Sequence, residues 1–527
     1  MKKKSQEIIL LCLMVGILFF TALNSNLYFK RFDVTENRVY TISDVSRNLF
    51  KEIPEQVHMT YYISEKLDKR SPIPGQIEDL LNEYAVYSRG KITVSVVDPV
   101  KEGSASQAER LGVIPQQMEV VEQSEKSVAV VYSGIVIQYL DRFETLPFVL
   151  QTETLEYELT SKIRKVVKNE EKSIGILVGD AGRTLSQDYA LLQDNLSGDY
   201  TVREIKRGEG IPDDISVLFV LGNKDFSKED LLPIDRYIMN GGRVLFCVEG
   251  VYVDMMRNLE ARKIEDSPLY DMLRNYGVEV EQKLVLDEYA RDFRIPQQFF
   301  GSIAWQVIGK YPHWVAVIRQ NVLRDNPLTA RFSGLDLLWP SPLKKLDVEG
   351  VKAEELLKTS PRAWTMEKNF DTNPYNAHVF QATRSETEGQ YVLAYALTGM
   401  FPAYFGENGD SNQEEEIDRK SPETRMLVIG DSDFASNLIQ FSASRYNLTF
   451  LENIAEWLAS EDDLLRIKTR VARDIRLNTI QDPDTEKAVY FFSQIVNVVL
   501  IPLLVILYGI NRFLRRRKRR YLEWGGA

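Results

Sequence analysis

The chain has 527 residues, of which 44% are hydrophobic and 27% are charged, and its formal net charge is −11 at pH 7. This length is too great for one hydrophobic core and predicts roughly three or four folded units. The composition is that of a folded protein, and only two cysteines, Cys12 and Cys247, are present, which excludes a small disulfide-stapled scaffold.

The N-terminus has a basic start followed by an uncharged segment. Residues 1–7 include Lys2, Lys3 and Lys4, and residues 8–29 contain no charged side chain. Since about 20 helical residues cross the hydrocarbon core of a bilayer, residues 8–29 are predicted to form a first transmembrane helix. A cleaved signal peptide is the rival interpretation, because only residues 8–23 are strongly apolar. No clean small-x-small cleavage site follows, which favours an uncleaved anchor.

Residues 30–150 are predicted to contain a small α/β domain. "VHMTYYIS" and "KITVSVVDP" have the composition of strands, and "IEDLLNEYAVYSRG" between them reads as a helix that stops near Gly90. A short helix around Gln107 to Leu111 and the strands of "SVAVVYSGIVIQYL", bent at Gly134, follow. This order is typical of thioredoxin-like domains. The motif Cys-x-x-Cys is absent, which excludes thioredoxin redox chemistry.

A connecting helix within residues 151–172 leads to a second domain, residues 173–460. Here short buried strands alternate with helices, which predicts a mostly parallel sheet. The strands "IGILVGD", "VLFVLGN" and "MLVIGDSDF" each contain Gly-Asp or Gly-Asn at the end of the apolar run. "SKED", Ser227 to Asp230, is a capping box that predicts a helix running to about Met239, before Gly241 and Gly242 lead into another strand.

The remaining segments of the middle are less regular. Residues 290–400 contain strand-like runs without clean alternation, and their fold stays open. Residues 406–423 are acidic and rich in turn formers, which predicts a solvated loop or a disordered insertion. "YNLTFLENIAEWLA" has a helical apolar stripe, and residues 461–487 read as a charged connector.

The C-terminus mirrors the N-terminus. Residues 488–510 are uncharged and precede a basic tail, residues 511–527, which predicts a second transmembrane helix with a cytoplasmic flank. Both termini are therefore expected in the cytoplasm, at the cytoplasmic (inner) membrane, with residues 30–487 on the other side. Because residues 1–7 carry +2 and residues 511–527 carry +6, a chain of net charge −11 leaves −19 for the middle. An acidic exterior disfavours nucleic acid and anionic lipid as partners.

Four polar residues follow the predicted strands of the second domain, namely Asp180, Asn223, Asp431 and Asp433. Because ligands bind beyond the carboxyl ends of strands in open parallel sheets, these residues are a candidate ligand or interaction pocket. The alternative is that Asp and Asn only turn the chain and cap the next helix, which is the commoner role of each residue alone. Two aspartates without a third carboxylate nearby make a poor metal site, and no metal or cofactor is predicted.

The chain carries no recognisable enzyme motif. It has three histidines, His58, His313 and His378, and neither G-x-S-x-G nor H-E-x-x-H. Cys247 lies within a predicted strand, which indicates a small buried apolar residue rather than a thiolate. G-x-x-x-x-G-K-[ST] is also absent, so the chain is not the phosphate-binding subunit of an ATP-driven pump. If ATP is used, a partner supplies the ATPase.

Several stretches together resemble the GldG-type auxiliary components of bacterial ABC transporters, a family first associated with gliding motility. The resemblance covers nearly the whole chain and rests on "RFDVTENRVYTIS", "VLFVLGNKDFSKEDLLPIDRYIMNGGRVLF", "MLVIGDSDFASN" and "NLTFLENIAEWL". It implies a flavodoxin- or glutamine-amidotransferase-like second domain, without implying amidase activity. It also implies two partners, a multispanning ABC permease and an ATPase.

The predicted fold class is therefore α/β. We expect a membrane-anchored protein with two terminal transmembrane helices and an exterior region that joins a thioredoxin-like small α/β domain to a flavodoxin- or amidotransferase-like parallel-sheet domain. The predicted function is a non-enzymatic accessory subunit of an ABC-type export or motility complex, in contact with membrane lipid and with an unknown substrate. Two alternatives stay open: an extracytoplasmic solute- or glycan-binding protein, and an envelope hydrolase with a degenerate amidotransferase-like site.

The segment after the first apolar run is a candidate coupling element. Asp33, Thr35, Tyr40 and Ser43 lie in an extended stretch, and Ser43 is expected to be the N-cap of a helix. A stiff segment would pass motion of the anchor to the exterior domain, whereas a simple connector would only dock there. A Gly-Ser insertion after Phe32 separates the two, because only a coupling element loses function without loss of folding.

Overall fold

The structure is a computed structural model, and its parts are described separately. The described residues are 42–122, 125–152, 154–169, 172–255, 257–299, 302–324, 326–329, 332–376, 380, 384–405, 420–441, 445–460, 463–465 and 467, with 14, 492, 503, 508–510 and 512. The chain divides into two compact units, Met1–Ala472 and Arg473–Ala527. The helices and strands named below all lie in the first unit.

A four-stranded sheet comes first along the chain, in the order β2-β1-β5-β6. Its strands are β1 (Val57–Ile63), β2 (Ile92–Val97), β5 (Ser133–Tyr139) and β6 (Arg142–Leu146). β1 and β2 are parallel, whereas β5 runs antiparallel to both β1 and β6. Four helices share one apolar core with this sheet, namely α2 (Asp44–Glu52), α3 (Glu65–Asp68), α4 (Ile73–Tyr87) and α6 (Leu155–Lys168). The segment also contains α5 (Ala105–Arg110) and a two-stranded sheet of β3 (Gln116–Glu122) and β4 (Glu125–Val131).

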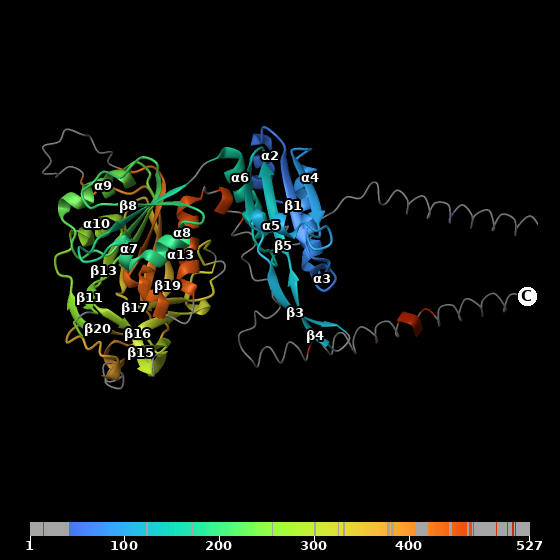
Figure 1. Cartoon of the computed structure of the whole chain (residues 1–527). Coiled ribbons are helices and arrows are strands. Elements are labelled where there is room, and N and C mark those ends of the chain that lie inside the picture. The colour runs from blue at the N-terminus through green and yellow to red at the C-terminus, as the bar shows by residue number, and fades with distance from the viewer. Residues whose placement is uncertain are drawn as a thin grey trace, which may run out of the picture. The chain divides into compact units, whose positions relative to one another are not determined.

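A second, larger sheet forms the centre of the other domain (Figure 1). In the described residues it has nine strands, in the order β13-β18-β21-β22-β10-β9-β7-β8, with β19 paired to β21. The strands are β7 (Ser173–Val178), β8 (Thr201–Ile205), β9 (Ile215–Leu221), β10 (Val244–Cys247), β13 (Val278–Val280), β18 (Leu343–Lys345), β19 (Val351–Lys358), β21 (Val392–Gly399) and β22 (Thr424–Ile429).

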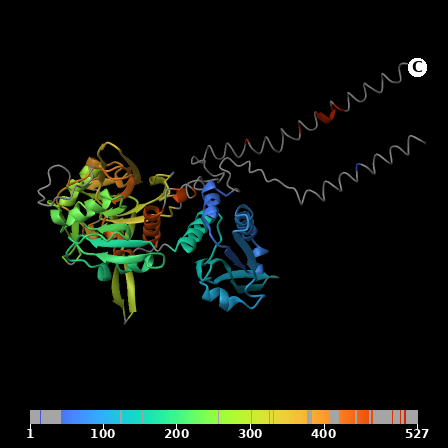
Figure 2. The same cartoon turned by 90° about the horizontal axis from the view of Figure 1, so that it is seen from above.

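Both faces of the large sheet are covered, because alternate residues of its central strands enter two different cores. Phe219 of β9 lies in one core with α7 (Leu185–Asp188), α8 (Ala190–Leu196) and α13 (Tyr446–Ala459). The next residue, Val220, lies in the other core with α9 (Lys228–Met239) and α10 (Pro268–Tyr276). Figure 2 shows the helices on the two sides of the sheet. Central strands buried on both faces account for runs such as "VLFVL".

Smaller strands pack beside this sheet. They are β11 (Val251–Asp254) with β12 (Glu260–Lys263), β14 (Leu284–Leu286) with β20 (Trp364–Met366), and the three-stranded group β15 (Ala290–Phe299), β16 (Ser302–Val317) and β17 (Leu335–Leu338). Short helices lie at α12 (Arg384–Thr387), Arg319–Asn321, Pro374–Asn376, Asp433–Ala435 and Asn437–Phe441.

The prediction of a mostly parallel second domain is corrected by the strand directions. β22, β10, β9, β7 and β8 run parallel to one another. By contrast, β21 is antiparallel to β22, and β19, β18 and β13 continue in antiparallel pairs. No helix separates β21 from β22 in the described residues, so no parallel crossover is made there. The sheet is mixed.

The predicted fold class is also wrong in its membrane part. Among the residues that the structure describes, no helix combines the length and the apolar character needed to cross a membrane. The two predicted spans, residues 8–29 and 488–510, lie outside the described residues except for Met14, Phe492, Leu503 and residues 508–510. Two terminal transmembrane helices are therefore not supported, and the described chain is mixed α/β.

Several local predictions are confirmed. The capping box at Ser227 and Asp230 is present and opens α9, which ends at Met239 as expected. Gly241 then adopts a positive φ of 86° and leads to β10. The stretch "YNLTFLENIAEWLA" forms α13 over its whole length. The acidic loop, residues 406–423, lies outside the described residues up to 419.

Candidate functional site

The four polar residues noted in the sequence all lie at the carboxyl end of the large sheet. Asp180 follows β7, Asn223 follows β9, and Asp431 and Asp433 follow β22. Each is buried, with at most 3% of its surface exposed. They occupy the edge where open sheets bind ligands, but protein atoms enclose their side chains.

Two further charged residues, Glu249 and Arg183, join them. Glu249 follows β10 and is 3% exposed, and Arg183 lies in the loop after β7. The Nη2 atom of Arg183 is 2.7 Å from Oδ1 of Asp433, and its Nε atom is 3.9 Å from Oδ2 of Asp180. We call the six residues the strand-end cluster: Asp180, Arg183, Asn223, Glu249, Asp431 and Asp433.

Asp431 joins the end of β17 to the turn after β22 through hydrogen bonds. Its Oδ2 atom accepts a hydrogen bond from the backbone N–H of Leu338 at 2.7 Å. Its Oδ1 atom accepts from the N–H groups of Asp433 and Phe434 at 2.7 and 3.1 Å. One carboxylate thus satisfies three buried backbone donors, two of them in the turn after β22. The helix-capping and turn interpretation fits Asp431 well.

Asn223 joins the ends of β9 and β10. Its Nδ2 atom donates to the carbonyl of Glu249 at 3.0 Å, and its Oδ1 atom accepts from the Glu249 N–H at 2.8 Å. The hydroxyl of Ser267 donates to the Asn223 carbonyl at 2.7 Å. Both ends of the Asn223 amide are therefore bonded to the backbone of Glu249.

The strand ends approach each other closely at Asp180. The backbone N–H of Lys224 donates to Oδ1 of Asp180 at 3.0 Å. A Cβ atom at Gly222 would lie 2.7 Å from that oxygen, and Gly222 has a φ of +83°. Glycine is therefore needed at 222 for both space and backbone conformation.

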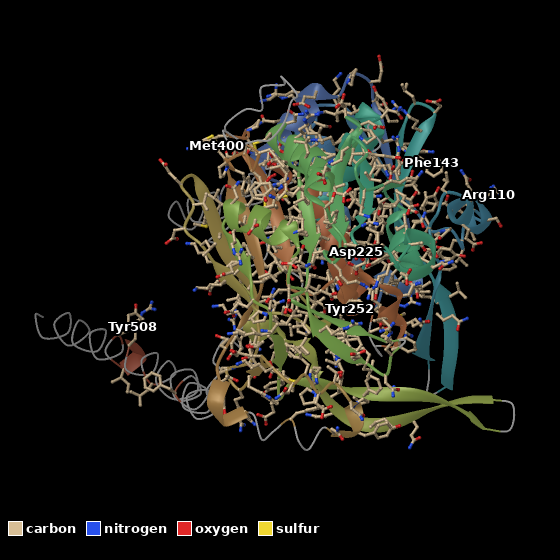
Figure 3. All side chains as sticks on the ribbon, turned by 90° about the vertical axis from the view of Figure 1, so that its left-hand side faces the viewer. Arg110, Phe143, Asp225, Tyr252, Met400 and Tyr508 are labelled. Atoms are coloured by element: carbon tan, nitrogen blue, oxygen red, sulfur yellow. The ribbon has the colours of Figure 1, made fainter. Side chains whose placement is uncertain are left out.

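The loops after β7 and β9 make two further contacts. The Ala181 N–H donates to Oδ2 of Asp225 at 2.9 Å. The Nζ atom of Lys224 lies 4.0 Å from the centre of the Tyr252 ring. Asp225 and Tyr252 are both labelled in Figure 3 and come from the loop after β9 and from β11. The first contact joins the loop that carries Arg183 to the loop after β9, and the second joins the loop after β9 to β11.

Burial and mutual repulsion change the protonation of the carboxyl groups. Burial raises the pKa of Glu249 and of Asp431 well above the usual range, and the negative charge of Asp433 raises both further. Burial also raises the pKa of Asp180, although Arg183 opposes this shift. Carboxyl groups in the cluster therefore hold protons at a pH where exposed carboxyl groups are ionised.

Three carboxyl oxygens in the cluster have no hydrogen-bond partner, namely Oδ2 of Asp180, Oε1 of Glu249 and Oδ1 of Asp433. The short contact between Arg183 and Asp433 is consequently an ion pair without hydrogen-bond geometry. The other oxygen of Glu249 accepts from the Ser432 hydroxyl at 3.0 Å. The cluster is thus a closed set of acidic groups, balanced by one arginine and by bound protons.

Other candidate chemical groups are also enclosed. In the described part of the chain, no group of three or more His, Cys, Asp or Glu residues could hold a metal ion. Burial raises the pKa of the Cys247 thiol well above its usual value, so a thiolate is disfavoured. Burial lowers the pKa of His313 to about 3, and neither ring nitrogen has a hydrogen-bond partner. His58 contacts hydroxyls through both ring nitrogens, and His378 lies outside the described residues.

Only part of the candidate coupling segment falls within the described residues. Ser43 is the N-cap of α2, and its hydroxyl accepts from the Ser46 N–H, as the sequence predicts. Asp33, Thr35 and Tyr40 lie outside the described residues. Of the residues that sequence reasoning missed, Glu249 could have been found because it also follows a buried strand at "LFCVE". Arg183 gives no such signal.

Two family models match the chain. One is described as "ABC-type uncharacterized transport system" and matches residues 171–465, which is more than half of the chain. The other is described as "Domain of unknown function (DUF7088)" and matches residues 36–138. A curated protein of Borreliella burgdorferi, described as "Uncharacterized protein", is 26% identical over 528 residues, covering 98% of this chain and 100% of its own length.

Solved structures give weaker similarities. The N-terminal domain of mmIFT52 has a TM-score of 0.32 and 13% identity, covering 55% of this chain and 99% of its own. A ThuA-like protein from Bacteroides uniformis has a TM-score of 0.29 and 13% identity, covering 55% of this chain and 93% of its own.

Proposed function

We propose a function from one established premise: the chain belongs to the family of auxiliary components of ABC-type transport systems, whose model matches residues 171–465. In this proposal the chain is a non-enzymatic accessory subunit that associates with a multispanning permease and with an ATPase. Its folded region couples to the permease or gates it. The family match is the single observation that carries the proposal.

The sequence supports the assignment of ATP hydrolysis to another subunit. Nowhere in the 527 residues is there a G-x-x-x-x-G-K-[ST] motif, whose backbone and lysine would cradle the phosphates of ATP. An ABC-type system that includes this chain therefore draws ATP hydrolysis from another subunit.

The strand-end cluster supports a mechanical rather than a solute-binding role. The side chains of Asn223 and Asp431 form hydrogen bonds with backbone groups of neighbouring segments. Arg183 faces the carboxylates of Asp433 and Asp180. A sheet edge joined in this way transmits force between strand ends better than it captures a solute, because the amide of Asn223 and the carboxyl group of Asp431 are already bonded to backbone groups.

Solute binding is the second candidate, and one observation favours it. Oδ2 of Asp180 and Oε1 of Glu249 are buried acceptors without a partner, which a donor on a solute would satisfy if Arg183 moved aside. A thermal-shift screen with small polar solutes tests this candidate. A solute that stabilises the wild type and Asp180→Asn equally does not bind at the cluster.

The finer parts of the proposal are the GldG-type assignment, a connection with gliding motility, and the action of residues 30–487 outside the cytoplasm at the inner membrane. They are supported by the sequence resemblance and by the distribution of charge. Protease added to intact spheroplasts would cleave an exterior domain, whereas a domain inside would be cleaved only after lysis.

The assignment of ATP hydrolysis to a partner has a direct test. The full chain, expressed without its neighbouring genes, is expected to hydrolyse no ATP. The assembly purified from native membranes through a tag on this chain is expected to hydrolyse it, and replacing the P-loop lysine of the partner ATPase should abolish that activity. Hydrolysis by the chain alone would contradict the proposal.

A further inference from the structure

The hairpin of β15 and β16 extends beyond the sheet to which it belongs. β17 pairs only with Trp314 to Val317 of β16, at the base. From Asp292 to Phe299, β15 pairs with Ser302 to Lys310 of β16. In the described residues this distal part has no third strand, and Figure 3 shows it extending away from the rest of its domain. Both outer edges of the distal hairpin are therefore open.

The distal hairpin has an unusual composition. Residues 295–309, "IPQQFFGSIAWQVIG", contain no charged side chain, although 27% of the whole chain is charged. Val307, within this stretch, is 52% exposed. A long apolar hairpin with open edges favours aggregation in water unless another molecule covers it.

The register places apolar positions on both faces. Pro296 pairs with Trp305, and Gln298 pairs with Ile303, so these positions share one face. Ile295 pairs with Gln306 and Phe299 with Ser302, so these positions share the opposite face. A hairpin that covers a single core would be apolar on one face only. Apolar positions on both faces favour an apolar medium around the tip over one flat protein surface.

Cations surround the hairpin where the uncharged stretch ends. Arg294 and Lys310 flank residues 295–309, and both are exposed. Arg291 lies nearer the base, where it forms an ion pair with Asp336 of β17 at 2.7 Å. We call Arg291, Asp292, Arg294 and Lys310 the neck. With Asp336, which neutralises Arg291, the neck carries a charge of +1 from Arg294, Lys310 and Asp292, whereas the middle of the chain carries −19.

We propose that the tip of the β15–β16 hairpin docks in the interface of a lipid bilayer, with the neck cations at the level of anionic headgroups. The acidic domain as a whole disfavours such a surface. Its charges are screened over about 8 Å at physiological ionic strength, however, and Arg294 and Lys310 lie beyond the part of β16 that pairs with β17.

The length and the composition of the tip agree with docking in the bilayer interface. Five residue pairs, from 295 to 299 with 302 to 306, span about 14 Å, roughly half of a hydrocarbon core of about 30 Å. The open backbone edges keep the tip in the interface, because unpaired N–H and C=O groups need water. Tryptophan is enriched at that depth. Pro296 interrupts the edge of β15 and opposes pairing with a strand of another protein.

The test uses the full chain with Cys12→Ser, in which Cys247 stays buried. Gln306→Cys carries an environment-sensitive dye, and Gln117→Cys is its matched control. Gln117 lies in the β3–β4 hairpin, opposite Val130. The protein is added to phosphatidylcholine vesicles with or without phosphatidylglycerol and with a nitroxide lipid at headgroup depth. The dye at 306 is expected to shift to the blue and to be quenched, and the dye at 117 to do neither.

Variants of the tip and neck separate the contribution of the apolar side chains from that of the cations. Phe299→Glu with Trp305→Glu should abolish the quenching at 306. Arg294→Gln and Lys310→Gln should each lower the docked-to-undocked ratio about fivefold, and only on anionic vesicles. Circular dichroism and thermal unfolding of each variant confirm the fold.

Three outcomes overturn the proposal. A dye at 306 that stays in water in a folded protein shows that the tip does not dock. Equal quenching at 117 and 306 shows that contact is unspecific. A shift that grows with protein concentration without vesicles shows that a second copy covers the hairpin. The inference does not rest on the proposed transport role, since the vesicles hold neither a permease nor an ATPase.

Discussion

At the scale of single residues, the polar side chains at the carboxyl end of the large sheet join the loops and turns that follow its strands. Asp431 accepts hydrogen bonds from three backbone N–H groups, and Asn223 pairs with the backbone of Glu249. The sequence predicted these positions from local turn signals. It did not predict the charge balance, because Arg183 and Asp433 are far apart in the chain and no local pattern relates them.

The first prediction concerns Glu249→Gln. The pKa of Glu249 is raised by burial and by the charges of Asp433 and Asp180, so the folded protein binds this proton more tightly than the unfolded chain. As pH rises above the unfolded value of about 4.5, the wild type should lose up to about 1.4 kcal/mol of unfolding free energy per pH unit, until the folded pKa is passed.

The amide that replaces the Glu249 carboxyl group lacks this titration but retains a carbonyl for the Ser432 hydroxyl. In denaturant unfolding from about pH 5 to about pH 8, the free energy of unfolding of the variant should therefore rise relative to that of the wild type as pH rises. Glu78→Gln, at an exposed position, is the control and should show no such trend. A difference between Glu249→Gln and wild type that is constant with pH would mean that Glu249 does not hold a proton.

The second prediction concerns Arg183→Met. The variant leaves the buried carboxylate of Asp433 without its cation, so the free energy of unfolding should fall by about 3–5 kcal/mol. Arg203→Met is the matched control. It breaks an ion pair with Asp214 of similar length, 2.6 Å, but about half of each side chain is exposed, and the cost should be about 0–1 kcal/mol. Equal losses in the two variants would show that burial does not set the strength of the Arg183 pair.

At the scale of elements, helix α2 is fixed by a residue distant in sequence. Oε1 of Glu156, in the first turn of α6, accepts from the Ser43 N–H at 2.5 Å and from the Ser46 hydroxyl at 2.8 Å. The hydroxyl of Tyr84 donates to the Glu156 carbonyl at 2.9 Å. The helix that begins after the candidate coupling segment is thus joined to α6 through buried hydrogen bonds.

The third prediction concerns Glu156→Ala. Two buried donors at the start of α2 would lose an acceptor, at about 1–3 kcal/mol each. Hydrogen exchange of the α2 amides should accelerate at least about tenfold. Glu52→Ala, at the exposed end of the same helix, should leave the exchange near wild type. Unchanged exchange in Glu156→Ala would show that α2 is held by its apolar face alone.

Elements with local signals were predictable from the sequence, and elements that depend on distant partners were not. α9 begins at a capping box, and α13 has a clear apolar stripe. β19, β21 and the β15–β16 hairpin give no comparable signal, because strand direction depends on pairing across many residues. For the same reason the positions of Asp180 and Asp431 were predictable, but their closure by Glu249 and Arg183 was not.

At the scale of the whole molecule, the described chain is a set of α/β units in a family of transport-system auxiliary components. Its largest sheet is buried on both faces, and its strand-end edge is closed by its own side chains. The sequence contains no ATP-binding loop of the pump type. Such a chain is suited to act through other subunits, and the proposed role depends on their presence.

Purification of the native assembly tests this central claim most directly. The full chain, tagged at its own locus, is extracted from membranes in mild detergent and analysed by quantitative mass spectrometry. We predict that one P-loop ATPase and one multispanning permease copurify in a fixed ratio to this chain, and that a tag on that permease recovers the same set. Recovery of the folded chain without either subunit, from both extracted and cross-linked cells, would contradict the account.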